Sequence, residues 1–168
     1  NQAIVGLKGS KISSDSSSRA DPTTDHLIIT GSNCRIQGLE IDGDRNDAVQ
    51  EIRSVFIDSE DNVLIQDCIF TDSGVGVWCA NTSKVNILNN RFEKSLDNKS
   101  AIVTEGTASG NAENILIQGN YFGECTEEAI DINAKTNSVV IDGNVFYKNH
   151  TGTDVDGTEC IDVGSNSD

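Results

Sequence analysis

The stretch Ile115-Leu116-Ile117-Gln118-Gly119-Asn120-Tyr121-Phe122 contains the pattern that decides the fold, because it recurs along the chain. The pattern is an apolar residue, a variable residue, Ile, a polar residue, a turn residue, often Asn, any residue, and then Phe. Four further copies occupy residues 34–41, 63–70, 85–92 and 139–146. Four of the five Phe residues fill the last position, where the first copy has Ile41: Phe70, Phe92, Phe122 and Phe146. A fixed pattern that returns in this way is typical of repeat architectures.

A second, shorter pattern lies between these copies. It covers residues 55–57, 77–79, 102–104, 130–132 and 161–163, where apolar residues occupy alternate positions. A period of two predicts strands, and no segment keeps the 3.6-residue period of a helix. The repeat length varies between about 22 and 31 residues, so we expect the excess residues of the longer repeats to form loops.

Together the two patterns predict an all-β, single-domain, single-stranded right-handed parallel β-helix over residues 1–168, with about five to six coils. Equivalent residues of successive coils would stack about 4.8 Å apart. The Phe position would form one interior column, and Asn90, Asn120 and Asn144 would form a hydrogen-bonded ladder in a turn. A second interior column would contain Ile36, Ile65, Ile87, Ile117 and Ile141. The alternative is an antiparallel sandwich, which would not demand the same side chain at the same position of every coil.

The two ends carry separate expectations. Residues 10–25 are rich in Ser and predict a solvated loop. The chain ends at Gly164-Ser165-Asn166 with no evident cap, so a fragment and end-to-end self-association both stay open. No signal peptide is visible, and we expect Asn1 to begin a mature or trimmed chain.

Composition excludes several classes of partner. The 168 residues include 27 acidic and 12 basic side chains, which gives a formal charge of −15. Nucleic acid and anionic membranes both require a basic surface, so neither is an expected partner. No apolar run approaches the roughly 20 residues of a membrane span.

The cysteines bear on the compartment. The chain has five Cys, none of them in a C-x-x-C pair. It has only two His, His26 and His150, and both lie in loop-like stretches. A zinc site is therefore not expected. An odd count in an acidic chain rich in Ser, Thr and Asn fits a secreted protein with up to two disulfides. The alternative is five small buried hydrophobic residues. N-x-S/T sequons at Asn81, Asn98 and Asn149 would matter only in a secreted eukaryotic protein.

Acidic residues crowd two consecutive coils. Ile130 and Ile132 point inward, so Asp131 points outward, and Asp162 follows one coil later. Stacked carboxylates repel unless a cation or water screens them, and all-oxygen ligands suit Ca²⁺. The alternative is a solvated acidic surface. The whole cluster consists of Glu127, Glu128, Asp131, Asp154, Asp156, Glu159 and Asp162.

The earlier coils place aromatic residues in the same outward column. Phe56, Trp78 and Val103 share the position of Asp131. An outward Trp beside carboxylates could form a platform on which a sugar ring stacks. The alternative is that a long loop, 43–53 or 104–113, covers these side chains.

Basic residues near the cluster are candidate catalytic bases. Lys135 follows the Asp131 strand, and Arg91 flanks Asn90 in the turn, with Lys84 and Lys94 close by. For each of them the alternative is a plain surface charge. No G-x-S-x-G motif is present, so the chain shows no sign of a nucleophile elbow.

The segment Cys125-Thr126-Glu127-Glu128-Ala129-Ile130-Asp131-Ile132, followed by Lys135-Thr136 and residues 139–146, resembles the repeats of secreted right-handed β-helix proteins of the pectate-lyase superfamily. The resemblance covers roughly residues 30–165. It implies Ca²⁺ bound by acidic side chains, which acidifies the proton beside a uronate carboxylate, and a Lys or Arg that removes this proton in a β-elimination. Glu127, Glu128 and Asp131 are similar to the acidic run of one lyase family, with Glu where that family has Asp. The chain departs from the family in having no full lyase signature and fewer coils, and many members of the superfamily are non-catalytic.

These observations predict a secreted, carbohydrate-active protein that acts on or binds an acidic polysaccharide, with Ca²⁺-assisted β-elimination as the specific enzyme hypothesis. The candidate residues are Lys135 and Arg91 for catalysis, Trp78 and Phe56 for the sugar, and Glu127, Glu128, Asp131, Glu159 and Asp162 for the metal. The competing hypothesis is a non-catalytic extracellular structural, adhesive or carbohydrate-binding module, because fold alone does not choose a function. An acidic protein would repel an acidic polysaccharide unless Ca²⁺ bridges them.

Overall fold

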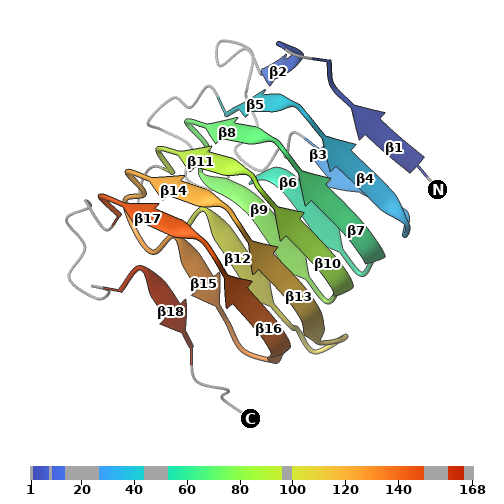
Figure 1. Ribbon diagram of the computed structural model, residues 1–168. Coiled ribbons are helices and arrows are strands. Elements are labelled where there is room, and N and C mark those ends of the chain that lie inside the picture. Colours follow the sequence, from blue (N-terminus) through green and yellow to red (C-terminus); the bar gives the residue numbers. More distant parts are fainter. Residues whose placement is uncertain are drawn as a thin grey trace, which may run out of the picture.

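The computed structural model describes residues 2–7, 9–13, 27–43, 53–95, 100–149 and 159–164. In these ranges the chain forms three parallel sheets of six strands each, which lie around one long axis (Figure 1). Sheet A contains β1 (Gln2–Val5), β4 (Cys34–Gln37), β7 (Asp61–Gln66), β10 (Ser83–Leu88), β13 (Ala112–Gln118) and β16 (Thr136–Asp142). Sheet B contains β2 (Lys11–Ser13), β5 (Glu40–Asp42), β8 (Ile69–Thr71), β11 (Arg91–Glu93), β14 (Tyr121–Gly123) and β17 (Val145–Tyr147). Sheet C contains β3 (Leu27–Ile29), β6 (Arg53–Asp58), β9 (Val75–Ala80), β12 (Ile102–Glu105), β15 (Ile130–Ile132) and β18 (Ile161–Val163).

Each coil contributes one strand to each sheet, so the predicted parallel solenoid is correct. The longer sequence pattern spans a strand of sheet A and the following strand of sheet B, and the shorter pattern forms sheet C. The predicted count of five to six coils needs refinement. Each sheet has six strands, and two of these are edge strands, so about four turns are enclosed between neighbours on both sides.

The first coil, formed by β1, β2 and β3, escaped the sequence pattern. Strand β2 lies inside the predicted loop 10–25, which is therefore wrong for Lys11–Ser13, and residues 14–25 lie outside the described residues. This coil has neither the Asn nor the Phe of the later copies. Ile12 stands opposite Ile41 in sheet B and occupies the Phe position.

The interior consists of stacked columns of like residues. Ile36, Ile65, Ile87 and Ile117 pair in register and are at most 1% exposed, while Ile141 in the last coil is half-buried. In the second column the rings of Phe70, Phe92, Phe122 and Phe146 lie almost parallel, with centroids 4.7, 5.1 and 5.2 Å apart. Stacked aromatic pairs of this kind add about 0.5–1.5 kcal/mol each beyond the apolar area that they bury.

The predicted Asn ladder is confirmed. Asn90 donates its side-chain amide and its backbone N–H to Oδ1 of Asn120, at 3.1 and 2.8 Å, and Asn120 makes the same two bonds to Asn144. Each side-chain amide also donates to a carbonyl of a preceding coil, as Asn120 does to Ile87 at 2.9 Å. The ladder therefore satisfies backbone groups that the turn would otherwise leave buried and unpaired.

The turn residue that precedes the Asn position has a structural reason. It adopts a positive φ in every copy, between 54° and 70°. Only Gly adopts this conformation without a steric penalty, and Asn and Asp tolerate it best among the other residues. The five residues at this position are Gly38, Asp67, Asn89, Gly119 and Gly143.

All five cysteines are free thiols, so the structure shows none of the predicted disulfides. Cys34, Cys68, Cys79 and Cys125 are buried, and Cys160 is exposed. Burial raises the pKa of the Cys79 thiol to about 12, because the apolar interior disfavours the thiolate. The four buried cysteines thus behave as the small hydrophobic residues of the alternative interpretation.

Candidate functional site

The outward face of sheet C carries the column predicted to hold the site. In register along the axis stand Ile28, Phe56, Trp78, Val103, Asp131 and Asp162. The predicted outward direction is confirmed for Phe56, Trp78 and Asp131, because the alternate positions of their strands are buried, whereas Val103 is only 6% exposed. Along one column the chemistry changes from apolar through aromatic to acidic.

The aromatic part of this column is held by a cation and a carboxylate. The guanidinium carbon of Arg53 lies 3.7 Å from the ring centroid of Phe56 and 5.1 Å from that of Trp78. The indole Nε1 of Trp78 donates a hydrogen bond of 2.9 Å to Oε1 of Glu105, one coil further on. These contacts fix the orientation of the indole while leaving the side chain half-buried.

A pocket of about 190 Å³ lies beside Trp78. We call it the Trp78 groove. Its lining combines one large aromatic side chain with carboxylates, an amide and a hydroxyl. The lining residues are Val75, Trp78, Ser100, Val103, Glu105, Glu127, Asp131 and Asn133.

Asp131 has one carboxylate oxygen buried in the groove. Its Oδ2 accepts a hydrogen bond of 2.8 Å from Nδ2 of Asn133, while its Oδ1 is buried without a hydrogen-bond partner among the described residues. Burial raises the pKa of this carboxyl to about 6, and the negative charges of Glu128, Asp162 and Glu105 act in the same direction. Asp131 can therefore hold or release a proton near neutral pH, as a general acid or base must.

The other predicted metal ligands are spread around Asp131. Glu127 lines the groove, Oε2 of Glu128 accepts a hydrogen bond of 3.1 Å from Ser100, and Asp162 stands beside Asp131 in the ladder. Glu159 lies at the start of the last described segment, just before β18. Asp154 and Asp156 lie outside the described residues.

The arrangement of these carboxylates decides how well Ca²⁺ fits the site. Among the residues that the structure describes, no three His, Cys, Asp or Glu side chains converge in the way a metal ion requires. Oδ1 of Asp131 has no hydrogen-bond partner among the described residues and could bind a cation. Oε2 of Glu128 and Oδ2 of Asp131 each already accept a hydrogen bond from a neighbouring side chain. We assign no reaction step to the ion, and calcium binding stays a prediction.

The predicted catalytic bases do not join this groove. Lys135 lies in the turn after β15, where its Nζ donates to the carbonyl oxygen of Thr107 at 3.3 Å. Arg91 lies on the outward face of sheet B, where it forms an ion pair with Glu93. Neither Lys135 nor Arg91 lines the Trp78 groove, and a catalytic role for either residue stays a prediction.

Sequence reasoning missed three polar residues of this face: Arg53, Glu105 and Asn133. Glu105 and Asn133 follow from the same alternation that places Val103 and Asp131 outward, extended by two residues. Arg53 could not be found in this way, because Ser54 and Val55 are both buried and the alternation breaks at the start of β6.

The alternative interpretation, in which a loop covers the aromatic residues, concerns two segments. Segment 104–113 contains the end of β12, a tight turn and the start of β13. In the turn Thr107 and Gly110 exchange backbone hydrogen bonds, so the segment is not a long covering loop. Its Glu105 nevertheless bonds to Trp78. Residues 44–52 of the other loop, like His26, Asn98 and His150, lie outside the described residues.

Two sequon asparagines use their side chains inside the fold. Nδ2 of Asn81 donates to Asp58 at 3.2 Å, and its Oδ1 accepts from the backbone and the hydroxyl of Thr107, both at 2.8 Å. Asn149 is part-buried, and its Nδ2 donates to the carbonyl oxygen of Phe122 at 3.3 Å. A glycan on either nitrogen would leave a single N–H to make the hydrogen bond that this nitrogen now donates.

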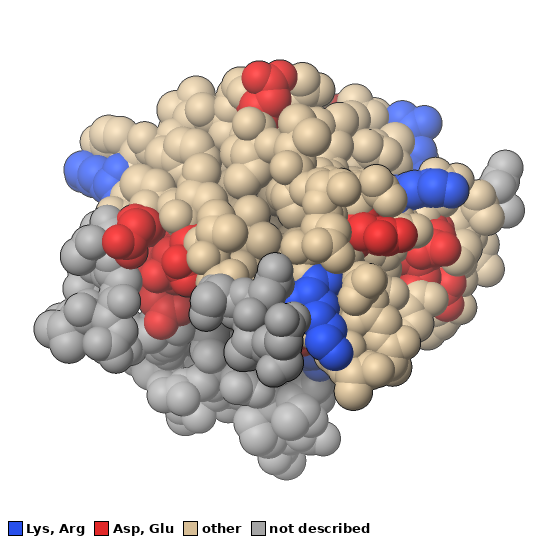
Figure 2. All heavy atoms as spheres, turned by 90° about the horizontal axis from the view of Figure 1, so that it is seen from below, with Lys and Arg blue, Asp and Glu red and all other residues tan. Residues whose placement is uncertain are grey.

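The surface charge is distributed in patches. Figure 2 shows acidic side chains in separate groups among uncharged ones, with single basic side chains between them.

No helix in the described part of the chain has the length and apolar character needed to cross a membrane.

A family model described as the right-handed β-helix region matches residues 2–168. The chain therefore belongs to the right-handed β-helix family, and the predicted handedness of the solenoid is confirmed. No curated protein and no solved structure matches the chain.

Proposed function

We propose that this protein is a carbohydrate-binding β-helix and that the Trp78 groove holds a sugar unit of the ligand. The observation that carries the proposal is the position of Trp78 on an outer sheet face, fixed by Arg53 and Glu105, beside a pocket lined with carboxylates and an amide. Aromatic faces pack against the apolar face of a pyranose ring, and carboxylate and amide groups bond to its hydroxyls.

The charge of the groove narrows the class of ligand. Glu105, Glu127 and Asp131 line it, and none of the described lining residues is Lys or Arg. A polyuronate would meet like charges at close range unless a cation bridged them. A neutral glycan avoids this repulsion, so we favour it as the ligand.

Trp78 is the single tryptophan of the chain, and its fluorescence therefore reports on this groove alone. We expect titration with a panel of neutral oligosaccharides, such as cellohexaose, xylohexaose and mannohexaose, to change the emission saturably with at least one of them. The variant Trp78→Ala should weaken binding by about tenfold or more, measured by calorimetry. Val140→Ala, an exposed residue on the outer face of sheet A, is the matched control and should bind normally. Unaltered affinity in Trp78→Ala would exclude this groove.

Calcium-assisted β-elimination of an acidic polysaccharide is the second candidate function. It is favoured by Oδ1 of Asp131, which has no hydrogen-bond partner among the described residues and lies near the negative charges of Glu128 and Asp162. The test is absorbance near 235 nm, where unsaturated uronates absorb, on pectate, alginate and glycosaminoglycans with and without EDTA. No signal on any of them excludes the lyase, and a melting temperature that is unchanged by Ca²⁺ excludes the cation site, because a ligand of the folded state must stabilise it.

The third candidate function is a structural role through self-association. We also propose that the protein is secreted. The two end coils expose apolar side chains, among them Leu7 in the first coil and Val163 in the last. Edge strands offer unpaired backbone groups to a further strand. Sedimentation velocity over a concentration series tests this alternative, and a monomer at every concentration excludes it.

A further inference from the structure

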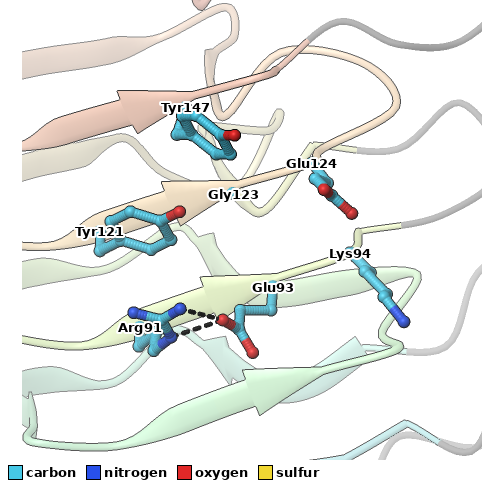
Figure 3. A pocket seen from close by; sticks show the side chains of 7 residues that line it. All are labelled: Arg91, Glu93, Lys94, Tyr121, Gly123, Glu124 and Tyr147. Carbon is cyan, nitrogen blue, oxygen red and sulfur yellow. Dashed lines mark hydrogen bonds and ion pairs between the residues drawn. The ribbon is translucent and has the colours of Figure 1, made fainter.

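A second groove lies on the outward face of sheet B, over strands β11, β14 and β17 (Figure 3). Its volume is about 290 Å³, near the lower end of the range of about 300–1,000 Å³ for pockets that bind small molecules. We call it the tyrosine groove, because it contains both tyrosines of the chain. The lining residues are Arg91, Glu93, Lys94, Tyr121, Gly123, Glu124 and Tyr147.

Gly123 makes room for one of the two rings. Glu93, Gly123 and Tyr147 occupy one outward column on successive coils, and Arg91 and Tyr121 occupy the next. A Cβ at Gly123 would lie 2.7 Å from Cε1 of Tyr121, closer than carbon atoms can approach. The ring of Tyr121 therefore lies over the backbone of Gly123, in space that any larger residue at this position would fill.

Charged neighbours hold the rings in place. The guanidinium carbon of Arg91 lies 4.3 Å from the ring centroid of Tyr121 and is itself ion-paired with Glu93. Nζ of Lys148 lies 5.2 Å from the ring centroid of Tyr147 and 3.8 Å from Oε1 of Glu124. Cation–π contacts are weak at exposed sites, so these contacts orient the rings more than they stabilise the fold.

The placement of aromatic residues in this chain is selective. Four of the five Phe residues form the interior column, whereas both Tyr residues and the single Trp lie at the two outer grooves. Tyr147 is 49% exposed and its neighbour Val145 is 55% exposed, so apolar surface here faces solvent. An aromatic residue with a polar tip suits a site that is apolar on one side and hydrated on the other.

We propose that the tyrosine groove is a second sugar-binding site, which takes one ring of a neutral glycan. The Tyr121 and Tyr147 rings offer faces for the apolar side of a pyranose, and Glu93, Glu124 and the two phenolic hydroxyls offer hydrogen bonds to its hydroxyls. Within the groove Arg91 and Lys94 balance Glu93 and Glu124, so an uncharged ligand loses no favourable charge interaction. The proposal does not rest on the Trp78 groove, which lies on a different sheet.

Two sites on two different sheets would make this one domain bivalent. Sheets B and C line the same solenoid but face different directions (Figure 1). One protein could then bind two glycan chains, or two segments of one chain with higher avidity.

The experiment uses the two tyrosines as reporters. With ¹³C-labelled tyrosine, the whole chain gives ring resonances from Tyr121 and Tyr147 only, and both belong to this groove. The probes are cellohexaose, xylohexaose and mannohexaose, each up to about 10 mM, with trigalacturonate as the charged comparison. We expect at least one neutral probe to shift both resonances saturably, in the intact chain and equally in Trp78→Ala.

Variants locate the contact. Tyr147→Ala and Tyr121→Ala should each weaken binding by about tenfold, followed on the remaining tyrosine. Gly123→Ala should weaken it as well, because the added methyl displaces the Tyr121 ring. Thr71→Ala is the matched control, since Thr71 stands in the same outward column two coils from Gly123 and does not line the groove.

The results that would overturn the proposal are distinct from those that would overturn the Trp78 groove. Tyrosine shifts that vanish in Trp78→Ala would mean a single site. Shifts with trigalacturonate alone would mean an anion site at Arg91 and Lys94. Shifts that never saturate, or no shift with any neutral probe, would mean that no neutral sugar binds here. A loss of tryptophan response with tyrosine shifts retained would leave this proposal standing by itself.

Discussion

The inner columns of the solenoid and the outer column of sheet C follow opposite rules. Inside, the same residue returns coil after coil, as in the Phe stack with its centroids about 5 Å apart. Outside, the residue changes along most of the column, from Phe56 to Trp78 to Val103 to Asp131, and only the last step, to Asp162, keeps the residue. Both regions share one backbone geometry, so the difference reflects what each column must do.

Repetition is required where successive coils must support one another. A single coil cannot bury its own apolar face, and each Phe or Asn completes the packing or hydrogen bonding of the coil before it. The outer column has no such duty, because its side chains lie outside the apolar interior that successive coils share. Its residues are therefore available for binding, and the two kinds of column should respond differently to substitution.

The largest effect is expected in the Phe stack. Phe122 is fully buried between Phe92 and Phe146, and Phe122→Ala would remove two ring contacts and leave a cavity. We expect the free energy of unfolding to fall by about 3–5 kcal/mol, measured by urea denaturation. If this variant does not fold, Phe122→Leu should lose about 1–2 kcal/mol.

Phe146→Ala is the internal control for this prediction. Phe146 stacks on one side only and is half-buried in the last coil, so its loss should be clearly smaller. Equal losses at the two positions would contradict the view that enclosure between coils, and not the ring itself, determines the contribution.

The next effect is expected in the Asn ladder. Asn120→Ala would leave the carbonyl of Ile87 and the backbone N–H of Asn90 without their partners, in a turn where Asn120 is 1% exposed. Each buried group left unpaired costs about 1–3 kcal/mol, so we expect a loss of about 2–4 kcal/mol by the same measurement. Asn144→Ala removes equivalent bonds in a part-buried position and should lose less. A ranking in the opposite order would refute the ladder as a source of stability.

These columns also explain how much of the fold the sequence predicts. Phe and Asn at fixed positions reveal the register of five coils, because only stacking demands such repetition. The coil formed by β1, β2 and β3 was missed, since its Ile4 and Ile12 lie eight positions apart, whereas their partners Ile36 and Ile41 lie five positions apart as in the other copies. The sequence left disulfides and buried thiols open as alternatives, because both give the same pattern of cysteines, and the structure shows free thiols.

The outer site was predictable only in part. Alternation places Trp78 and Asp131 outward, and that much follows from the strands. It does not say which side chains meet across coils, such as the indole of Trp78 with Glu105, because such contacts depend on rotamers and strand offset. It also does not say that Arg91 and Asp131 face different directions, since this depends on which sheet each strand joins.

Asp131→Asn probes the outer column with an effect of opposite sign. The folded pKa of Asp131 is about 6, above the value near 3.8 of an unperturbed Asp, so the folded state binds the proton more tightly than the unfolded state. The contribution of this carboxyl group to the free energy of unfolding should therefore be largest below about pH 4. It should fall as the pH rises to about 6. At pH 7 Asp131→Asn should be more stable than the parent by about 1 kcal/mol, allowing for solvent screening of this partly exposed group.

The measurement is the free energy of unfolding between pH 4 and pH 7 for parent and variant. We expect the curve of Asp131→Asn to be flatter over this window. Parallel curves for parent and Asp131→Asn would mean that the carboxyl titrates as it does in water.

The smallest change in stability is expected for Trp78→Phe. The substitution keeps an aromatic ring beside Phe56 and Arg53 but removes the N–H that donates to Glu105. Because the hydrogen bond is only part-buried, the free energy of unfolding should fall by less than about 1 kcal/mol. Sugar binding should persist at reduced affinity, since a ring face remains. A loss as large as that of Phe122→Ala would mean that the outer column supports the fold as the inner columns do, and the distinction between the two regions would fail.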